Sequence, residues 1–468
     1  MTSSRKSLLA VLVIVALGAS GCATVNRFNP FKGKEAKEVA SEGERISIIS
    51  ADQKLEPAEA LKGVDFFLPN PTVTADWPLP GGTAEQSVEN VDAAPNLSIA
   101  WRKSVGDGSK GAEHVMGPPV AAGGKVFTMD AAAVVTAHDA RSGAEVWKTN
   151  LRPGDKRDKE AGGGGVAYAN GKVYVTSGFR LVAQLDARTG ALGWRTRTEQ
   201  PIHGAPNVAA GRVYAVALDN TLLTFDTNTG APGWTYQALS ESARILAASS
   251  PAISGDTVVA SFGSGELVAL RTANGNDLWN EALSRASRTS ALSEIRDIPG
   301  RPVIYQGDVF AVSHSGVFAA TDLRTGQARW SLPVVGITSP WPAGDVVYVV
   351  SKDGLVVCAA RESGQIYWTR DLNAGVKVNK AKSGGRFSWM RLPGLPGRKN
   401  LKPIWSSPLL ANNRLIIVGT TGELVALNAK TGEIQRRMEI GAPALLGPIA
   451  AGDTIYVLTD TAQLIALR

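Results

Sequence analysis

The sequence is poor in cysteine, histidine and charge for its length. It has 2 Cys and 4 His among 468 residues, and 19% of its residues are charged. So few cysteines exclude a small fold held by disulfides, while 44% apolar residues are enough for a large core. The 50 glycines follow no three-residue period, which excludes a collagen-like chain. A net charge of +7, from 49 basic and 42 acidic residues, does not indicate dedicated nucleic-acid binding.

The first residues have the pattern of a cleaved export signal. Arg5 and Lys6 precede the apolar run Leu8–Leu17, and small residues lead to Cys22. A helix of ten residues covers only ~15 Å, about half the hydrocarbon thickness of a membrane, so residues 1–21 are predicted to be a signal peptide. The end of this segment resembles the lipobox of bacterial lipoproteins, although Ala19 stands where Leu is usual.

That resemblance implies acylation of Cys22, with palmitate-type chains, and sorting to the periplasmic face of the outer membrane because Ala23 is not Asp. The alternative is an ordinary secretory signal with an incidental cysteine. From residue 22 to about residue 96 the chain mixes charges with Pro and Gly and shows little apolar periodicity. We therefore predict a lipidated tether over residues 22–96.

From about residue 97 the sequence repeats with a period of roughly 38 to 51 residues. Each copy has three turn signals, the third of the type Thr189-Gly190, and then a tryptophan such as Trp194. Three turns join four short antiparallel strands, which is the plan of a propeller blade. The Asp before the third turn is expected to bond local backbone amides, as at Asp139, Asp186, Asp226 and Asp322.

Seven copies carry the third turn, and the C-terminal segment 447–468 has only the early strands of another. The missing outer strand is available around Trp101, which has no early strands before it. The sequence therefore predicts an all-β fold over residues 97–468: an eight-bladed β-propeller of four-stranded antiparallel blades, closed by pairing of the N- and C-terminal strands. The recurring tryptophans are expected to dock one blade on the next.

These repeats resemble the propeller repeat named after pyrroloquinoline quinone. Combined with the lipobox, they resemble the BamB family of lipoproteins, as does Ser293-Glu294-Ile295-Arg296-Asp297-Ile298 before the fifth full repeat. The resemblance implies a non-enzymatic scaffold of the outer-membrane β-barrel assembly machinery that docks on the POTRA domains of BamA. It implies no cofactor and no nucleic-acid partner.

Two loops are the candidates for partner binding. One contains Arg244, Ile245 and Leu246, a charge beside two aliphatic residues; the other contains Glu294, Arg296 and Asp297. The family's leucine-leucine-arginine order is not reproduced in the first loop. The alternative is that both are solvated loops without a partner.

Other features of the sequence bear on alternative functions. A quinoprotein dehydrogenase is the alternative function, but such enzymes need a calcium site and many have adjacent cysteines, which this sequence lacks. The histidines show no metal-ligand spacing or triad context, so neither a catalytic nor a metal site is predicted. They are His114, His138, His203 and His314.

A third hypothesis is that blade edges bind nascent outer-membrane chains by strand addition. A basic insertion at about residues 371–403 is either a flexible loop or a contact for anionic lipid, peptidoglycan or an acidic partner.

Overall fold

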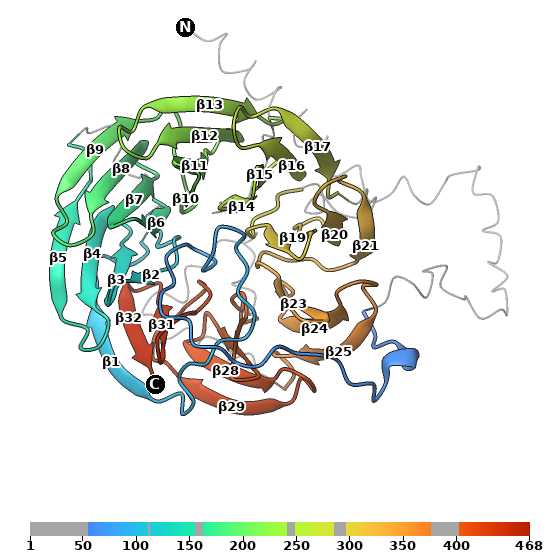
Figure 1. The fold of residues 1–468 in the computed structure, drawn as a ribbon. Coiled ribbons are helices and arrows are strands. Elements are labelled where there is room, and N and C mark those ends of the chain that lie inside the picture. The colour runs from blue at the N-terminus through green and yellow to red at the C-terminus, as the bar shows by residue number, and fades with distance from the viewer. Residues whose placement is uncertain (1–54, 111–112, 155–161, 241–248, 285–295, 376–401) are drawn as a thin grey trace, which may run out of the picture. The chain divides into compact units, whose positions relative to one another are not determined.

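The computed structural model describes residues 55–110, 113–154, 162–240, 249–284, 296–375 and 402–468. They belong to one compact unit, Gln53–Arg468, whose strands form eight separate four-stranded antiparallel sheets arranged in a ring (Figure 1). The prediction of eight blades is confirmed. The only helical element in this described part is the short 3-10 helix η3, Glu59–Leu61, and no described helix has the length and apolar character of a membrane span.

Blades 1 to 4 follow one another along the chain, each running from an inner to an outer strand. Blade 1 has β2 Val120–Ala122, β3 Lys125–Met129, β4 Val134–Asp139 and β5 Glu145–Asn150; blade 2 has β6 Gly164–Ala169, β7 Lys172–Ser177, β8 Leu181–Asp186 and β9 Leu192–Arg197; blade 3 has β10 Asn207–Ala209, β11 Arg212–Val216, β12 Thr221–Asp226 and β13 Pro232–Gln237; blade 4 has β14 Ala252–Ser254, β15 Thr257–Ser261, β16 Glu266–Arg271 and β17 Asp277–Ala282.

Blades 5 to 8 continue this order. Blade 5 has β18 Val303–Tyr305, β19 Asp308–Val312, β20 Phe318–Asp322 and β21 Ala328–Leu332; blade 6 has β22 Trp341–Ala343, β23 Val346–Val350, β24 Leu355–Ala360 and β25 Ile366–Asp371; blade 7 has β26 Leu409–Ala411, β27 Arg414–Val418, β28 Glu423–Asn428 and β29 Ile434–Glu439; blade 8 has β30 Ile449–Ala451, β31 Thr454–Leu458 and β32 Gln463–Leu467.

The ring closes within blade 8, as predicted from the incomplete C-terminal repeat. Its outer strand is β1, Ile99–Ser104, which pairs antiparallel with β32 so that Trp101 lies opposite Ala466. The order of this sheet is therefore β1-β32-β31-β30. Because the first and last strands share one sheet, ring closure leaves no open interface between the two ends of the propeller.

The middle strands are buried on both sides, because neighbouring blades pack face to face. In β23 and β31 every residue is buried, whereas the outer strand β29 is almost entirely exposed. The apolar side chains between adjacent blades form the core, and the largest fully buried ones include Tyr214, Tyr348 and Phe310. Continuous Val and Ile runs in these strands are typical of sheets covered on both faces.

Six of the recurring tryptophans dock their blade on the next through a hydrogen bond and a ring contact, as predicted. Their indole N–H groups donate to a backbone oxygen in the following blade, and their rings cover the glycine of its third turn; the ring of Trp101 in blade 8 covers Gly143 in the same way without such a bond to any described residue. The pairs are Trp147 with Ala187 O, Trp194 with Thr227 O, Trp234 with Thr272 O, Trp279 with Leu323 O, Trp330 with Arg361 O and Trp368 with Ala429 O, at 2.7–3.2 Å.

Blade 7 uses a different residue at this position. Arg436 occupies the place of the tryptophan in β29 and donates to the backbone oxygen of Asn96, in the segment that leads into β1. Arg414 of the same blade donates to the oxygens of Ala94 and Pro95. The junction between blades 7 and 8 is thus completed by residues that come from the N-terminal side of the ring.

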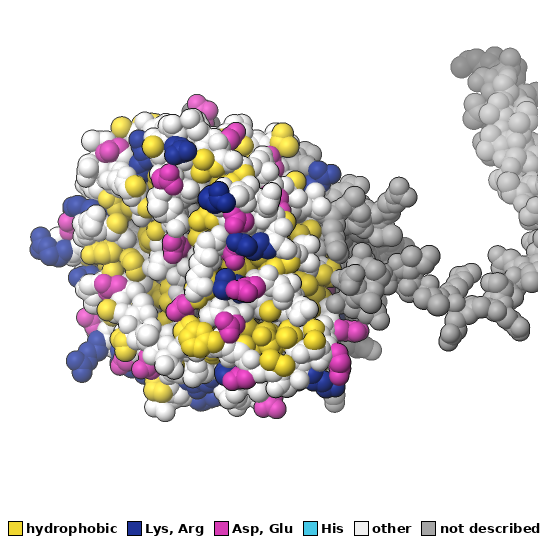
Figure 2. All heavy atoms as spheres, turned by 45° about the vertical axis from the view of Figure 1, so that its right-hand side comes forward, with side chains coloured by type: hydrophobic (Ala, Val, Ile, Leu, Met, Phe, Trp, Pro, Cys, Tyr) yellow, Lys and Arg dark blue, Asp and Glu magenta, His cyan; other side chains and the backbone are white. Residues whose placement is uncertain are grey.

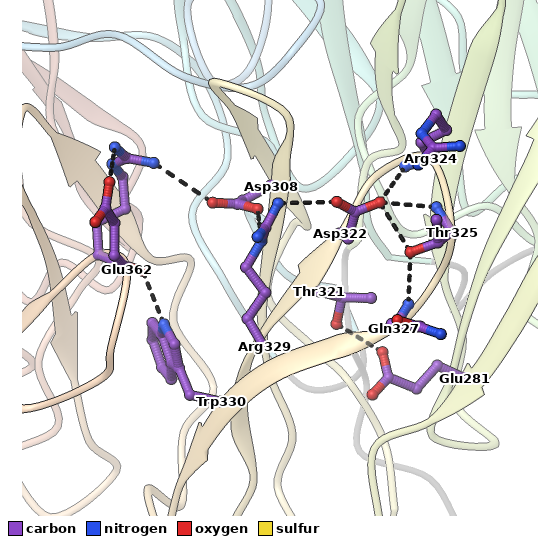
Figure 3. Close-up of polar contacts among 11 residues, drawn as sticks. Glu281, Asp308, Thr321, Asp322, Arg324, Thr325, Gln327, Arg329, Trp330 and Glu362 are labelled. Atoms are coloured by element: carbon purple, nitrogen blue, oxygen red, sulfur yellow. Dashed lines mark hydrogen bonds and ion pairs between the residues drawn. The ribbon is translucent and has the colours of Figure 1, made fainter.

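Polar side chains join blades 5 and 6 (Figure 3). Arg329 bonds both Asp308 and Asp322 within blade 5, and Arg361 of blade 6 reaches Asp308 Oδ2 at 3.4 Å. Asp322 also accepts hydrogen bonds from the backbone N–H groups of Arg324 and Thr325. These bonds lower the pKa of Asp322, and the same turn arrangement recurs at Asp139, Asp186 and Asp226, which confirms the predicted local role of these carboxylates.

The segment before β1 crosses the ring on one side (Figure 1). Residues 72–94, here called the strap, form hydrogen bonds with all eight blades beside the turns that follow the inner strands. In blade order, the partners are Trp77 N with Ala121 O, Tyr168 N with Pro78 O, Asn207 Nδ2 with Ala84 O, Ile253 N with Ala84 O, Ile304 N with Glu85 O, Trp341 Nε1 with Glu89 O, Val91 N with Leu410 O and Ala94 N with Asp453 O.

The strap also buries apolar side chains against the ring. Trp77 is 1% exposed and stacks on Trp341, with ring centroids 6.2 Å apart. Further along the chain, Val91 and Leu97 belong to the core of blades 7 and 8. Residues 55–96 are therefore part of the folded unit, whereas the sequence assigned them to the tether. The rest of that segment, with Cys22 and the signal peptide, lies outside the described residues.

Candidate partner-binding face

The two sides of the ring differ in what they carry. The strap covers the side of the turns that follow the inner strands, and the opposite side carries the loops that connect one blade to the next. The sequence placed both candidate binding loops among these connections. Arg244, Ile245, Leu246 and Glu294 lie outside the described residues, as does most of the basic insertion, so of the candidate residues Arg296 and Asp297 are described.

Arg296 is exposed on the connection between blades 4 and 5. It lies directly over the second turn of blade 4, so close that a Cβ added to Gly265 would be 2.8 Å from the Arg296 Cβ. The backbone there is held by the next residues, since Ile298 N–H donates to Phe262 O at 3.3 Å. The described part of this loop thus presents one arginine on a fixed backbone.

Asp297 does not lie on the surface, contrary to the sequence-based expectation. It is 1% exposed, and its backbone oxygen accepts a 2.8 Å hydrogen bond from His314 N–H in blade 5. The chain turns inward at this residue to reach the inner strand β18, and Asp297 lines a small pocket together with Asn220 of blade 3 and Ser261 of blade 4. A buried carboxylate cannot set the register of a docked partner, so Asp297 is a structural residue of the loop.

Two exposed aliphatic residues flank Arg296 on the neighbouring connections. Leu239, between blades 3 and 4, is 68% exposed although its N–H donates to Glu266 Oε2 and its oxygen accepts from Asn220 Nδ2. Val335, between blades 5 and 6, is 39% exposed, and its oxygen accepts from Lys352 N–H. The three residues Leu239, Arg296 and Val335, here called the arc, occupy consecutive connections.

Sequence reasoning missed Leu239 and Val335. Both follow shortly after an outer strand, β13 and β21, where an aliphatic residue has no strand neighbour to cover it. An arginine between aliphatic residues on a fixed backbone is the composition of a small binding hot spot. By contrast, another side of the ring shows basic and acidic side chains interspersed with apolar ones (Figure 2).

A cavity of about 400 Å³ lies among the inner ends of these connections, on the side away from the strap. Its wall includes Arg301, Ser339 and Ser407, which precede the inner strands of blades 5, 6 and 7. His114 and Asp460 also line it, beside apolar residues such as Met116 and Leu446. Burial raises the pKa of Asp460, and burial lowers the pKa of Arg301 to about 10.

The other histidines are buried among the blades. His138 and His203 are 2% and 9% exposed, and burial lowers the pKa of both below the usual value. His314 lies 2.9 Å from Lys352 Nζ. Within the described ranges, no group of three or more His, Cys, Asp or Glu side chains has the arrangement of a metal site. Cys358 is buried in β24, so it behaves as a small apolar residue.

Sequence comparison relates the chain to one family. The family model described as outer membrane protein assembly factor BamB matches residues 131–370 and 375–468. The BamB of Salmonella typhimurium is 27% identical over 413 residues, covering 85% of this chain and 96% of the relative. The BamB of Escherichia coli is 27% identical over 402 residues, with 85% and 93% covered.

Solved structures share the propeller fold. BamB from Moraxella catarrhalis has a TM-score of 0.58 at 18% identity, covering 78% of this chain and 97% of that one. The quinohemoprotein alcohol dehydrogenase of Comamonas testosteroni has a TM-score of 0.62 at 15% identity, with 84% and 80% covered. At these identities the likeness establishes the fold alone.

Proposed function

This chain belongs to the BamB family of outer membrane protein assembly factors, and we propose that it is a non-enzymatic scaffold of the β-barrel assembly machinery. In this proposal the protein docks on the POTRA domains of BamA and is held at the periplasmic face of the outer membrane by acyl chains on Cys22. The relatives are named for assembly of outer membrane proteins, and the family model covers most of the propeller.

The observation that carries the docking proposal is the arc. Arg296 lies between the connections of Leu239 and Val335, and each of these side chains is exposed on a backbone fixed by hydrogen bonds. Aliphatic contacts around one arginine give affinity without a large ordering cost, because the backbone is already in place. Glu294 belongs to the same connection as Arg296, and three further predicted residues belong to the connection of Leu239; we propose that all four extend the same surface. These three are Arg244, Ile245 and Leu246.

The docking proposal is tested by surface plasmon resonance on immobilised POTRA domains. The double variant Leu239→Asp, Arg296→Glu is expected to weaken binding at least about tenfold, since hot-spot residues contribute 1–2 kcal/mol or more each. The matched control is Leu192→Asp, Arg324→Glu, which makes the same changes at exposed residues of an outer strand and of a turn on the strap side. Equal affinities for both double variants would reject the arc as the binding surface.

The anchor is tested separately. Cells labelled with radioactive palmitate should incorporate label into the wild-type protein and not into Cys22→Ser, which should leave the outer-membrane fraction. Label retained by Cys22→Ser would reject this acylation site.

A dehydrogenase is not favoured for this chain. The dehydrogenases of known structure that share its fold are only 14–15% identical to it, while its curated relatives are assembly factors. Titration with pyrroloquinoline quinone and Ca²⁺ tests that alternative directly. Stoichiometric, calcium-dependent binding together with dye-linked alcohol oxidation would overturn the scaffold proposal.

A further inference from the structure

The cavity lies at the end of the ring opposite the strap. The strap bonds all eight blades beside the turns that follow the inner strands, whereas the cavity is lined by residues that precede those strands. The inner strands have only three to six residues, so the strap and the cavity lie at opposite ends of a short axis. A ligand can therefore approach the cavity from the loop side, away from the strap.

One wall of the cavity carries a cation that has no counter-charge among the described residues. The guanidinium of Arg301 forms no hydrogen bond or ion pair with the described residues, and its Nε is buried. Other arginines that contact the interior have partners: Arg361 bonds Asp308, and Arg414 bonds two backbone oxygens. Arg301 is half-buried, and withdrawing its Nε from water without a partner has a cost that an anion in the cavity would relieve.

Two hydroxyl groups extend this wall. Ser339 Oγ accepts a 2.9 Å hydrogen bond from the backbone N–H of Arg301, and Ser407 Oγ accepts a 2.8 Å bond from the backbone N–H of Ser339. These bonds fix both oxygens, while their hydroxyl protons have no acceptor within the described part of the chain. Arg301, Ser339 and Ser407 thus form a row of unused donors on blades 5, 6 and 7.

The remaining walls are different. Asp460 lies on blade 8, three blades from Arg301, and its carboxyl can accept a hydrogen bond from a ligand. Apolar side chains, among them Met116, Ile337 and Leu446, line the space between. The cavity therefore offers donors at one side, an acceptor nearly across from them, and an apolar surface in the middle. Its volume falls within the range of small-ligand sites.

We propose that this cavity binds a carboxylate attached to a small apolar body, with the carboxylate held by Arg301, Ser339 and Ser407. The C-terminal apolar residue of a polypeptide has this chemistry, with a backbone N–H that can reach toward Asp460. A free small organic carboxylate shares the anionic and apolar parts. Arginine suits this role because its planar guanidinium can donate two parallel hydrogen bonds to a carboxylate.

Isothermal titration calorimetry on the full mature protein tests the proposal. The probes are N-acetyl-Gly-Phe with a free carboxylate, its C-terminal amide, and 3-phenylpropanoate, in a buffer without phosphate. The free peptide acid should bind saturably, and amidation should weaken binding by about tenfold to a hundredfold because a charged hydrogen-bonding group is lost. Binding of 3-phenylpropanoate with the same affinity as the peptide acid would identify a free carboxylate as the source, and weaker binding would identify a peptide C-terminus.

Variants assign the binding to this wall. Arg301→Gln should weaken binding of the peptide acid as much as amidation does and should leave binding of the amide unchanged. Arg324→Gln, an exposed arginine on the strap side, should bind like wild type. Because Arg301 is unpaired, Arg301→Gln should melt no lower than wild type without ligand, which separates lost binding from lost folding. The proposal would be overturned if the peptide acid showed no saturable binding, or if the acid and the amide bound with equal affinity.

Discussion

Arg361 in blade 6 lies 3.4 Å from Asp308 in blade 5, a carboxylate that is 4% exposed and is also bonded by Arg329 (Figure 3). One buried acid thus serves two arginines, one in its own blade and one in the next. Arg361 further donates to the backbone oxygen of Gly344, so its guanidinium is held at the junction.

Replacing Asp308 is expected to loosen this junction. Asp308→Ala leaves two arginines without their shared carboxylate, and the loss of one partner of a buried ion pair costs about 3 kcal/mol. Urea unfolding should therefore show a clearly lower midpoint. Asp256→Ala is the control, because its ion pair with Arg271 is exposed at both ends and should contribute less than about 1 kcal/mol. Equal losses for the two variants would contradict the role given to Asp308.

The contact between a tryptophan and a turn glycine contributes measurably to the free energy of unfolding. Gly230 has φ +70° and an added Cβ would overlap the ring of Trp194, whereas Gly211 has φ +73° and open space around it. Gly211→Ala should cost only the strain of a positive φ, about 1–2 kcal/mol. Gly230→Ala should cost a further 1–3 kcal/mol or so from overpacking. Thermal or urea unfolding measures the difference, which should vanish in a Trp194→Ala background.

The strap is expected to stabilise the ring. A protein that begins at residue 53 retains every described hydrogen bond and should melt as the full mature chain does. A protein that begins at residue 98 loses the strap and should melt at a distinctly lower temperature. Trp77→Ala provides a point test, with an expected cost of about 3–5 kcal/mol for a fully buried aromatic residue. Equal melting temperatures for the two shortened proteins would show that the strap does not stabilise the ring.

Acidification should destabilise the propeller through its buried histidines. Burial lowers the pKa of His138 and His203 in the folded protein, so the unfolded chain binds protons near pH 6.5 that the folded chain does not. Stability is therefore lost as the pH falls below about 7, by up to about 1.4 kcal/mol per pH unit for each histidine, until the folded pKa is reached. Melting temperatures between pH 7.5 and pH 5 should show this slope, and His203→Gln should reduce it. An unchanged slope in the variant would exclude His203 as a contributor.

The architecture could be predicted because its signals are local and repeated. A turn such as Thr189-Gly190 and a tryptophan such as Trp194 recur in most copies, so both the number of blades and the shared last blade follow from counting. The strap could not be predicted in this way. It contacts the ring mainly through backbone groups, as at Ala84 and Glu85, which leave no apolar period in the sequence.

The candidate site was predictable only in part. Arg296 is exposed as expected, but the adjacent Asp297 is buried, because the sequence does not show where a connection turns inward. The cavity was missed for a related reason. Arg301, Ser339 and Ser407 belong to three different repeats, and only the closed ring brings them to one wall.

The shared blade has a kinetic consequence for an exported chain. Of the described strands, β1 is the first to leave the ribosome or a secretion channel, and its partner β32 is the last. Until β32 arrives, β1 has an unpaired edge, and the interval spans nearly the whole domain. Pairing over such a long sequence separation makes folding slow and leaves the incomplete ring prone to aggregation. Folding intermediates of this protein are therefore expected to depend on holding chaperones for longer than those of a propeller closed within a single terminal repeat.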